Sequence, residues 1–159
     1  MKCAFIILGI ATATCFSTLP ESGFYNVEDM LVRYAPAAKQ NGSTWDPLNG
    51  LPDIFLEFSM DDGDYDWVIH TNGVKENSGT SASWSHSWEI CFEDPSQESS
   101  DIHLMVKIWD SDSFQSDFMD SGSIPLSSLV VGENEIQCNY GSHVTFTITG
   151  PHNEGRIHP

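Results

Sequence analysis

Short runs in which apolar and polar residues alternate dominate the chain between residues 29 and 150. The clearest is "IHLMVKIW", which places Ile102, Leu104, Val106 and Ile108 on one side of an extended strand, because successive side chains of a strand point to opposite faces. The similar runs are rich in Val, Ile, Phe, Trp and Thr, as strands are. Strands are predicted at 30–35, 53–60, 66–71, 87–93, 102–110 and 143–150, with a further candidate at 135–140.

Clusters of Gly, Pro, Asn, Asp and Ser, the residues typical of turns, separate these runs. No segment has a long apolar period of the helical kind, although "IPLSSL" at 124–129 predicts a single helical turn. Seven or eight short strands at this spacing predict an all-β fold, an antiparallel β-sandwich. We expect one domain at 29–150, followed by a loose C-terminal tail at 151–159.

The N-terminal segment "MKCAFIILGIATATCFS" has the order of a secretory signal peptide. Lys2 precedes an apolar run over residues 4–10, and small residues follow. The run is shorter than the ~20 residues that a membrane-spanning helix needs. We expect a signal peptide at 1–17 and a leader at 18–28, and therefore a secreted, extracellular protein. A buried N-terminal strand is the alternative.

The chain is strongly acidic, with 23 Asp and Glu residues against six Lys and Arg and a formal net charge of −17. This balance argues against nucleic acid as a partner, because phosphates are bound by basic residues. It also argues against simple electrostatic attraction to anionic lipid. The acidic groups must therefore be solvated or neutralised by bound cations.

Two acidic segments stand next to predicted strands. The segment "WDSDSFQSDFMDSG" contains Asp110, Asp112 and Asp117, and the upstream segment "WDPLNGLPD" contains Asp46 and Asp53. Carboxylates that converge repel one another, and Ca²⁺ relieves the repulsion by accepting about six to eight oxygen ligands. The matched segments predict a calcium site. The alternative is a pair of solvated loops, since Asp favours turns.

These motifs resemble those of the C2 domain, a family of calcium-dependent phospholipid-binding sandwiches. "WDPLNGLPDIFL" is similar to the family's "DPNGLSDPYV"-like loop, "WDSDSFQSDFMDSG" to its "WDxDxxxxxDFxG" loop and "IPLSSL" to its "IPLxxL" segment. Within the family, "VKIWDSDS" and "ENEIQCNYGSHVTF" are most similar to the C-terminal C2 domain of perforins. The resemblance covers residues 30–150 and does not include the membrane-attack domain of perforins.

The resemblance implies an antiparallel eight-stranded C2-like β-sandwich of the perforin-type strand order, with Ca²⁺ as the bound ion. The ligands it implies are the carboxylates of Asp46, Asp53, Asp110, Asp112 and Asp117 and the main-chain carbonyl oxygens of Trp45 and Ser111. It places Asp120 outside the set of calcium ligands, at the periphery of the site. It also implies a phospholipid membrane surface as the calcium-dependent partner, with Leu48 and Phe114 entering the membrane and Trp109 fixing the base of its loop.

Two covalent features are predicted beside the calcium site. Cys91 and Cys138 are the cysteines outside the signal peptide, and in a secreted chain they are disulfide candidates. Two unpaired thiols are the alternative, since the partner cysteine of perforins, expected near residues 122–123, is absent. Asn41 begins an Asn-Gly-Ser sequence and is an N-glycosylation candidate.

No catalytic motif accompanies these features. The chain has neither a G-x-S-x-G nor an H-E-x-x-H sequence, and its histidines are interpreted as surface or satisfied residues rather than catalysts. We therefore expect a non-enzyme: a secreted, calcium-binding protein that binds phospholipid membranes in a calcium-dependent way. The alternative is an extracellular calcium-binding interaction protein whose partner is a protein, a glycan or a mineral surface.

Overall fold

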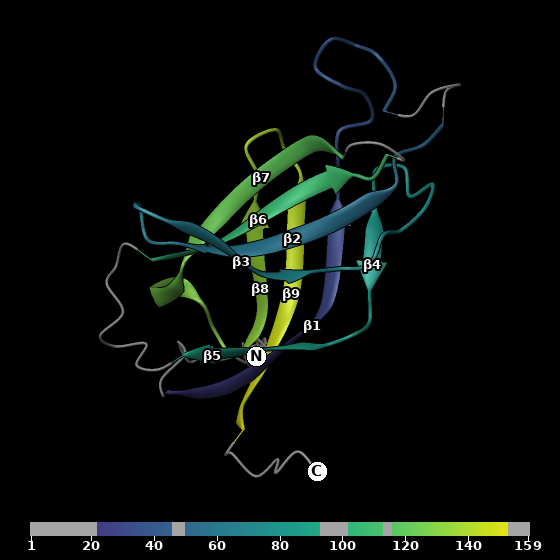
Figure 1. Cartoon of the computed structure of the whole chain (residues 1–159). Helices are drawn as coiled ribbons and strands as arrows, with labels where there is room; N and C mark the ends of the chain where they lie inside the picture. Colours follow the sequence, from purple (N-terminus) through teal and green to yellow (C-terminus); the bar gives the residue numbers. More distant parts are fainter. Residues whose placement is uncertain (1–21, 46–49, 93–101, 113–115, 153–159) are drawn as a thin grey trace, which may run out of the picture.

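The computed structural model describes residues 22–45, 50–92, 102–112 and 116–152. Within them, two antiparallel β-sheets pack face to face (Figure 1). One sheet has the strand order β3-β2-β6-β7, and the other has the order β4-β1-β9-β8, with β5 also paired to β1. The strands are β1 (Gly23–Arg33), β2 (Ile54–Asp61), β3 (Asp66–Thr71), β4 (Ala82–Trp84), β5 (Trp88–Phe92), β6 (His103–Asp110), β7 (Asp117–Pro125), β8 (Gly132–Gln137) and β9 (His143–His152).

Strands β4 and β5 form one interrupted edge of the second sheet. β4 pairs with the later part of β1, where Met30 faces Trp84, and β5 pairs with its beginning, where Val27 faces Trp88. The two strands therefore lie end to end along β1, separated by residues 85–87. Counting them as one position gives four positions in each sheet, which confirms the predicted eight-stranded antiparallel sandwich.

The core lies between the sheets and follows the alternation of the sequence. Leu104, Val106 and Ile108 on β6 are fully buried, as the pattern predicted. Phe58 and Phe146 from opposite sheets meet edge to face in the core, with ring centres 6.0 Å apart. Burying each such side chain contributes about 1.5–3 kcal/mol, so the core supplies most of the driving force for folding.

The domain extends further at both ends than the sequence predicted. β1 begins at Gly23, so residues 23–28, expected in a leader, belong to the first strand, with Tyr25 and Val27 fully buried. β9 continues to His152, which pairs with Phe24, so the first two residues of the expected tail are also part of the sheet. The predicted turn near 124–129 is present as a short 3-10 helix, Leu126–Ser128.

The last strand of the first sheet, β7, was not predicted because Asp, Ser and Gly disfavour strands in isolation. It forms by pairing along the whole of β6. The register shifts by one residue where Ile108 faces Asp120 and Trp109 faces Phe118, so Met119 is the extra residue of a β-bulge. Met119 and Asp120 are consequently both buried, at the base of the predicted acidic loop.

Candidate metal centre

Three of the five predicted carboxylates meet at one end of the sandwich. Asp110 ends β6 and pairs directly with Asp117, which begins β7, and Asp112 follows two residues after Asp110. One carboxylate oxygen from each of the three lies within 4.8 Å of the others. Asp110 is fully buried, and the other two are partly exposed. Asp117 thus lies beside Asp110 and Asp112 after the loop, as the sequence predicted.

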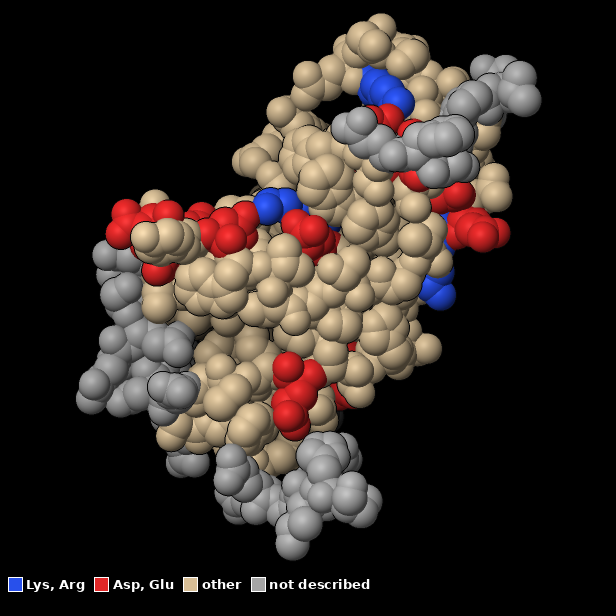
Figure 2. Space-filling view, in the orientation of Figure 1, with Lys and Arg blue, Asp and Glu red and all other residues tan. Residues whose placement is uncertain are grey.

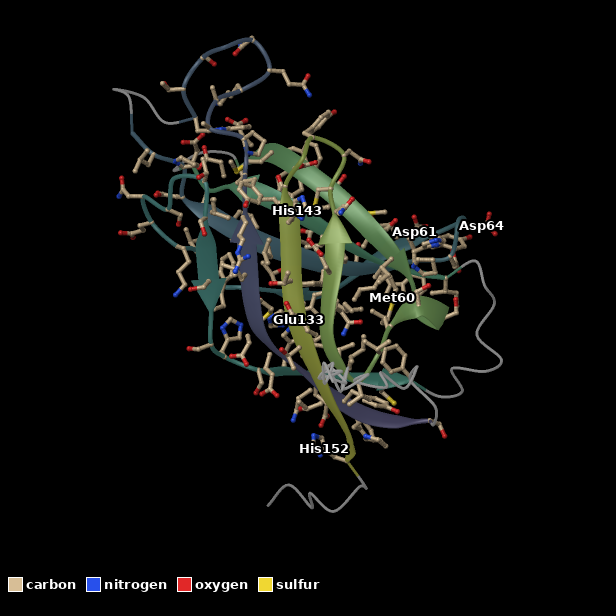
Figure 3. All side chains as sticks on the ribbon, turned by 180° about the vertical axis from the view of Figure 1, so that it is seen from behind. Met60, Asp61, Asp64, Glu133, His143 and His152 are labelled. Carbon is tan, nitrogen blue, oxygen red and sulfur yellow. The ribbon has the colours of Figure 1, made fainter. Side chains whose placement is uncertain are left out.

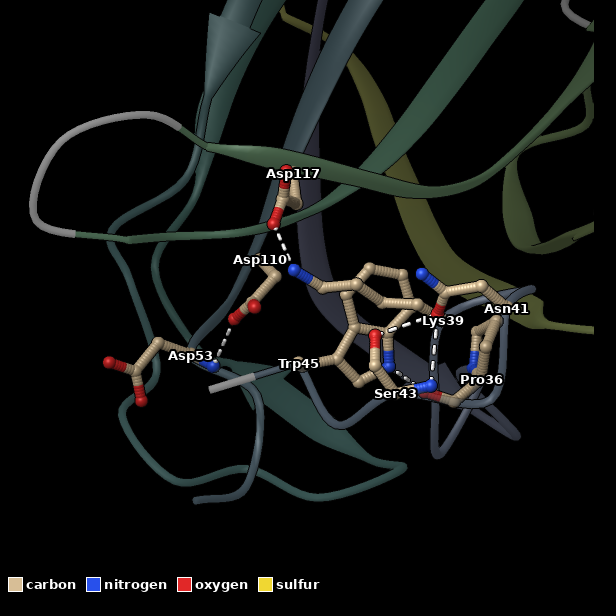
Figure 4. A network of polar contacts seen from close by, with 8 residues as sticks. All are labelled: Pro36, Lys39, Asn41, Ser43, Trp45, Asp53, Asp110 and Asp117. Atoms are coloured by element: carbon tan, nitrogen blue, oxygen red, sulfur yellow. Dashed lines mark hydrogen bonds and ion pairs between the residues drawn. The ribbon is translucent and has the colours of Figure 1, made fainter. Parts of the chain in front are cut away.

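An ammonium group lies beside these carboxylates. Lys39, in the connection between β1 and β2, binds Asp117 through its Nζ atom (Figure 4). The hydrogen bond with Asp117 raises the pKa of Lys39, and the charges of Asp117, Asp112 and Asp110 raise it further, against the opposing effect of burial. Lys39 therefore stays protonated and contributes positive charge to the group.

Trp45 supports the Lys39 side chain from below. Its indole Nε1 donates a hydrogen bond to the Pro36 carbonyl oxygen at 2.6 Å, and its ring is 6% exposed. The Lys39 Nζ atom lies 5.6 Å from the centre of this ring, a distance at which a cation is attracted to an aromatic face. Trp45 is thus part of the core at the base of the loop.

Asp53 connects the two halves of the predicted site through its backbone. Its N–H donates to Asp110 Oδ1 at 2.7 Å, and its carbonyl oxygen accepts a hydrogen bond from the Ser111 N–H at 2.9 Å. Its carboxylate accepts a hydrogen bond from the Asn77 N–H at 2.6 Å and points away from Asp110 (Figure 4). The structure therefore brings Asp53 to the site without adding its carboxylate to the group of three.

The other predicted features of the loops fall into two classes. Asp46, Leu48 and Phe114 lie outside the described residues. Trp109 is described, and it stacks on Phe55 with ring centres 6.3 Å apart and meets Phe118 edge to face at 5.6 Å. These contacts agree with the prediction that Trp109 fixes the base of its loop.

The donor set fits a hard cation. Oxygen atoms bound to one Ca²⁺ at about 2.3–2.6 Å lie at most about 5 Å from one another. The 4.8 Å limit on the three carboxylate oxygens is compatible with this geometry, and all three donors are oxygen atoms. Three carboxylates alone do not complete the coordination shell of Ca²⁺, which takes about six to eight oxygen ligands.

Asp120 lies outside the group of three carboxylates, in agreement with its expected peripheral position, and its side chain is fully buried. Its carboxylate accepts hydrogen bonds from the N–H groups of Ser121, Tyr140 and Ser142 at 2.8–3.1 Å, and from the Ser142 hydroxyl at 2.6 Å. These bonds attach the turn between β8 and β9 to β7. Asp120 therefore positions the turn between β8 and β9 without belonging to the group of three. This turn lies at the same end of the sandwich as Asp110, Asp112 and Asp117, the end that we call the loop end.

The predicted Cys91–Cys138 disulfide is wrong. Cys91 pairs with Phe24 near the end of β9, whereas Cys138 precedes its beginning, and β9 spans ten residues from His143 to His152 (Figure 3). At about 3.3 Å per residue the two cysteines lie at opposite ends of the sandwich. Burial, and to a smaller degree the charge of Asp120, raises the pKa of the Cys138 thiol to about 12, so this thiol stays protonated.

Sequence reasoning missed several residues at the loop end. Lys39 has no motif around it, and its only signal is that basic residues are scarce in this chain. Exposed apolar side chains of Leu51, Phe118 and Tyr140 also lie at this end, and Phe118 and Tyr140 line a hollow with Lys39. Asn41 is exposed in the same connection, where its side-chain oxygen accepts hydrogen bonds from the Ser43 N–H and hydroxyl.

No protein-family model matches the sequence, and no curated protein matches it. Solved structures do match. A structure titled "Structure of a C2 domain" has a TM-score of 0.51 and 16% identity, and the match covers 82% of this chain and 100% of that one. Calcium-bound Extended-Synaptotagmin 2 has a TM-score of 0.53 and 15% identity, covering 81% of this chain and 46% of that one. A structure titled "BON1-C2B" has the same score and identity, with 81% and 94% covered.

Among the described residues, no helix is long and apolar enough to cross a membrane. The two antiparallel sheets, the acidic loop end and the structural matches agree with one another. The chain has the fold of C2 domains.

Proposed function

We propose that this protein is an extracellular, non-catalytic calcium-binding module that binds phospholipid membranes in a calcium-dependent way, as perforin-type C2 domains do. The observation that supports the proposal most strongly is the convergence of Asp110, Asp112 and Asp117 at the loop end of a C2 fold. These carboxylates already have a cationic partner in Lys39. The site is therefore built to be neutralised by a cation.

Charge at the loop end explains the dependence on calcium. The acidic group repels lipid phosphate as long as only Lys39 offsets it. Ca²⁺ bound there supplies the missing positive charge and coordination positions for phosphate oxygens. Lys39 must release Asp117 for that oxygen to become a ligand. Competition from Lys39 is consistent with weak calcium binding, with a dissociation constant of about 10⁻⁴–10⁻³ M, as is typical of extracellular calcium modules.

Apolar side chains at the same end supply the contact with lipid. Leu51, Phe118 and Tyr140 are 53%, 43% and 57% exposed. Aromatic rings suit the membrane interface, and burying a large apolar side chain contributes about 1.5–3 kcal/mol. Leu48 and Phe114 remain predicted membrane contacts on the same loops. The charge of the acidic group opposes this insertion until a cation neutralises it.

Co-sedimentation with phosphatidylserine vesicles, in Ca²⁺ and in chelator, tests the proposal. Wild-type protein should sediment only in Ca²⁺. Asp112→Asn should abolish sedimentation, because it removes one charge from the acidic group while keeping the side-chain size. Asp64→Asn, in the turn between β2 and β3 at the opposite end, is the matched control and should bind as wild type does. Equal sedimentation in chelator, or full binding by Asp112→Asn, would contradict the proposal.

A second function is favoured by acidic residues far from the loop end. The turn between β2 and β3 gathers acidic side chains of Asp61, Asp62, Asp64 and Asp66 (Figure 2). Exposed Trp67 lies beside them. A calcium-binding protein that recognises a protein, a glycan or a mineral would use such a surface. Calcium-dependent thermal stabilisation without vesicle binding would select this function over the first.

A further inference from the structure

Two histidines face each other at an open edge of the sandwich, outside the acidic group. His70 lies on β3, the edge strand of the four-stranded sheet. His86 lies in the interruption between β4 and β5, on the edge of the other sheet. Their Nε2 atoms are 3.4 Å apart. The pair thus bridges two sheet edges that no backbone ladder joins.

The distance between the two nitrogen atoms is long for a hydrogen bond and fits two ligands of a shared metal ion. A hydrogen bond donated by N–H is usually about 2.7–3.2 Å long. Two nitrogen atoms bound to one Zn²⁺ at about 2.0–2.1 Å, at a tetrahedral angle, lie about 3.3–3.4 Å apart. Neighbouring ligands of a square-planar ion would lie closer together, at roughly 2.8–3.0 Å. The observed 3.4 Å is compatible with two ligands of one tetrahedral ion.

The surroundings fix the orientation of one ring and leave the other accessible. The His70 ring stacks on Trp88, with centres 4.7 Å apart and planes 7° from parallel, and Trp88 in turn packs on the core residue Phe58 at 5.4 Å. His70 is partly buried, whereas His86 is exposed. Burial lowers the pKa of His70, and the neutral ring is the form that binds metals. A ring held by core packing is already oriented for a ligand.

We propose that His70 and His86 form a zinc-binding site that joins the edges of the two sheets. Imidazole nitrogen suits Zn²⁺, whereas the all-oxygen group at the loop end suits Ca²⁺, so the chemistry of the ligands sorts the two metals. No third His, Cys, Asp or Glu completes a group around the pair among the described residues. The site therefore has two protein ligands and positions open to water, and it binds more weakly than a closed structural zinc site.

The proposed site explains why the edge strand is interrupted between β4 and β5. Residues 85–87 make no strand pairing, although β4 and β5 on either side of them both pair with β1. The break lies where His86 approaches His70. The inference does not depend on the proposed membrane function, since it uses none of the acidic residues.

Calorimetric titration with ZnCl₂, in excess Ca²⁺ so that the acidic group is occupied, tests the site. Wild-type protein should bind Zn²⁺ at one site. His70→Ala and His86→Ala should each weaken the Zn²⁺ affinity by about tenfold or more, because loss of a residue that only supports a metal ligand already costs about that much. His103→Ala on β6 is the matched control and should leave Zn²⁺ affinity unchanged. His86 is exposed and outside the strands, so its variant should fold even if His70→Ala does not.

Nitrogen NMR of the imidazole rings distinguishes metal binding from a purely structural role, because only a bound ion changes the chemical shifts of the ring nitrogens when Zn²⁺ is added. Addition of Zn²⁺ should shift the Nε2 signals of His70 and His86 and not those of His103. Zinc affinity unchanged in His86→Ala would overturn the site. So would an equal loss in His103→Ala, or loss of Zn²⁺ binding in Asp112→Asn, which would place the ion elsewhere.

Discussion

The ammonium group of Lys39 binds the carboxylate of Asp117 across 78 residues of sequence, and the charges of Asp112 and Asp110 act on the same group. A calcium ion at these carboxylates would have to displace this ammonium. Lys39 is therefore an internal competitor of calcium, and it also attaches the segment between β1 and β2 to the beginning of β7.

Lys39→Met should increase calcium affinity. Methionine keeps the long apolar stem against Trp45 and removes the charge that competes for Asp117. An exposed ion pair is worth about 0.2–1 kcal/mol, which corresponds to up to about a fivefold gain in affinity. Calorimetric calcium titration measures the change.

Lys107→Met provides the matched control. Lys107 also binds a carboxylate, that of Asp66, at 2.5 Å, but it lies in the middle of β6. Its removal should leave calcium affinity unchanged. If Lys39→Met bound calcium no more tightly than Lys107→Met does, the ammonium would not be competing for the site.

Tyr140→Ser should weaken vesicle binding and leave calcium binding intact. Tyr140 is exposed at the loop end, where it would enter the lipid interface without touching the ion. Loss of about 1.5–3 kcal/mol of apolar contact predicts at least a tenfold weaker vesicle affinity. Tyr65→Ser, in the turn between β2 and β3 at the opposite end, should behave as wild type. Equal effects of both variants would refute the assigned orientation on the membrane.

Asp120→Ala should destabilise the fold rather than the calcium site. It leaves the buried N–H group of Ser142 and the part-buried N–H groups of Ser121 and Tyr140 without their acceptor, at a cost of about 3 kcal/mol. Urea unfolding should show this loss, and calcium affinity of the folded protein should remain close to the wild-type value. Asp64→Ala, an exposed acidic residue, should change stability little. Normal stability of Asp120→Ala would mean that these hydrogen bonds are not needed.

Asp66 predicts a pH dependence of stability. The hydrogen bond from Lys107 is the largest cause that lowers the pKa of Asp66 in the folded state. A carboxylate whose pKa is lowered on folding stabilises the protein above its ordinary pKa and loses that effect as pH falls through the folded value. Asp66→Asn should therefore be less stable than wild type at neutral pH, with the difference vanishing in acid. A difference that persisted in strong acid would contradict this origin.

The alternation of apolar residues was sufficient to predict the fold class. Leu104, Val106 and Ile108 are buried on one face of β6, as their spacing required, and the sandwich follows from several such strands. β7 was missed because its polar sequence becomes a strand only through pairing with β6. The start of β1 at Gly23 was missed for a similar reason, since residues 23–27 gain their order from β5.

The candidate site was predictable only in part. The spacing of Asp110, Asp112 and Asp117 predicted their convergence, because the two strands that flank the loop return them to one place. The orientation of Asp53 depends on a hydrogen bond with the distant Asn77 N–H, which no local pattern encodes. Lys39 approaches from a connection without a motif. The orientation of Asp53 and the position of Lys39 therefore depend on contacts between residues far apart in the sequence, which local sequence patterns do not predict.

Calcium titration of the purified protein, with and without phosphatidylserine vesicles, tests the central claim most directly. If calcium and lipid share the site at Asp110, Asp112 and Asp117, each must increase the affinity for the other. We predict that vesicles tighten calcium binding several-fold and that Asp112→Asn removes both the binding and the coupling. Calcium affinity that is the same with and without vesicles, or that survives Asp112→Asn, would contradict the account.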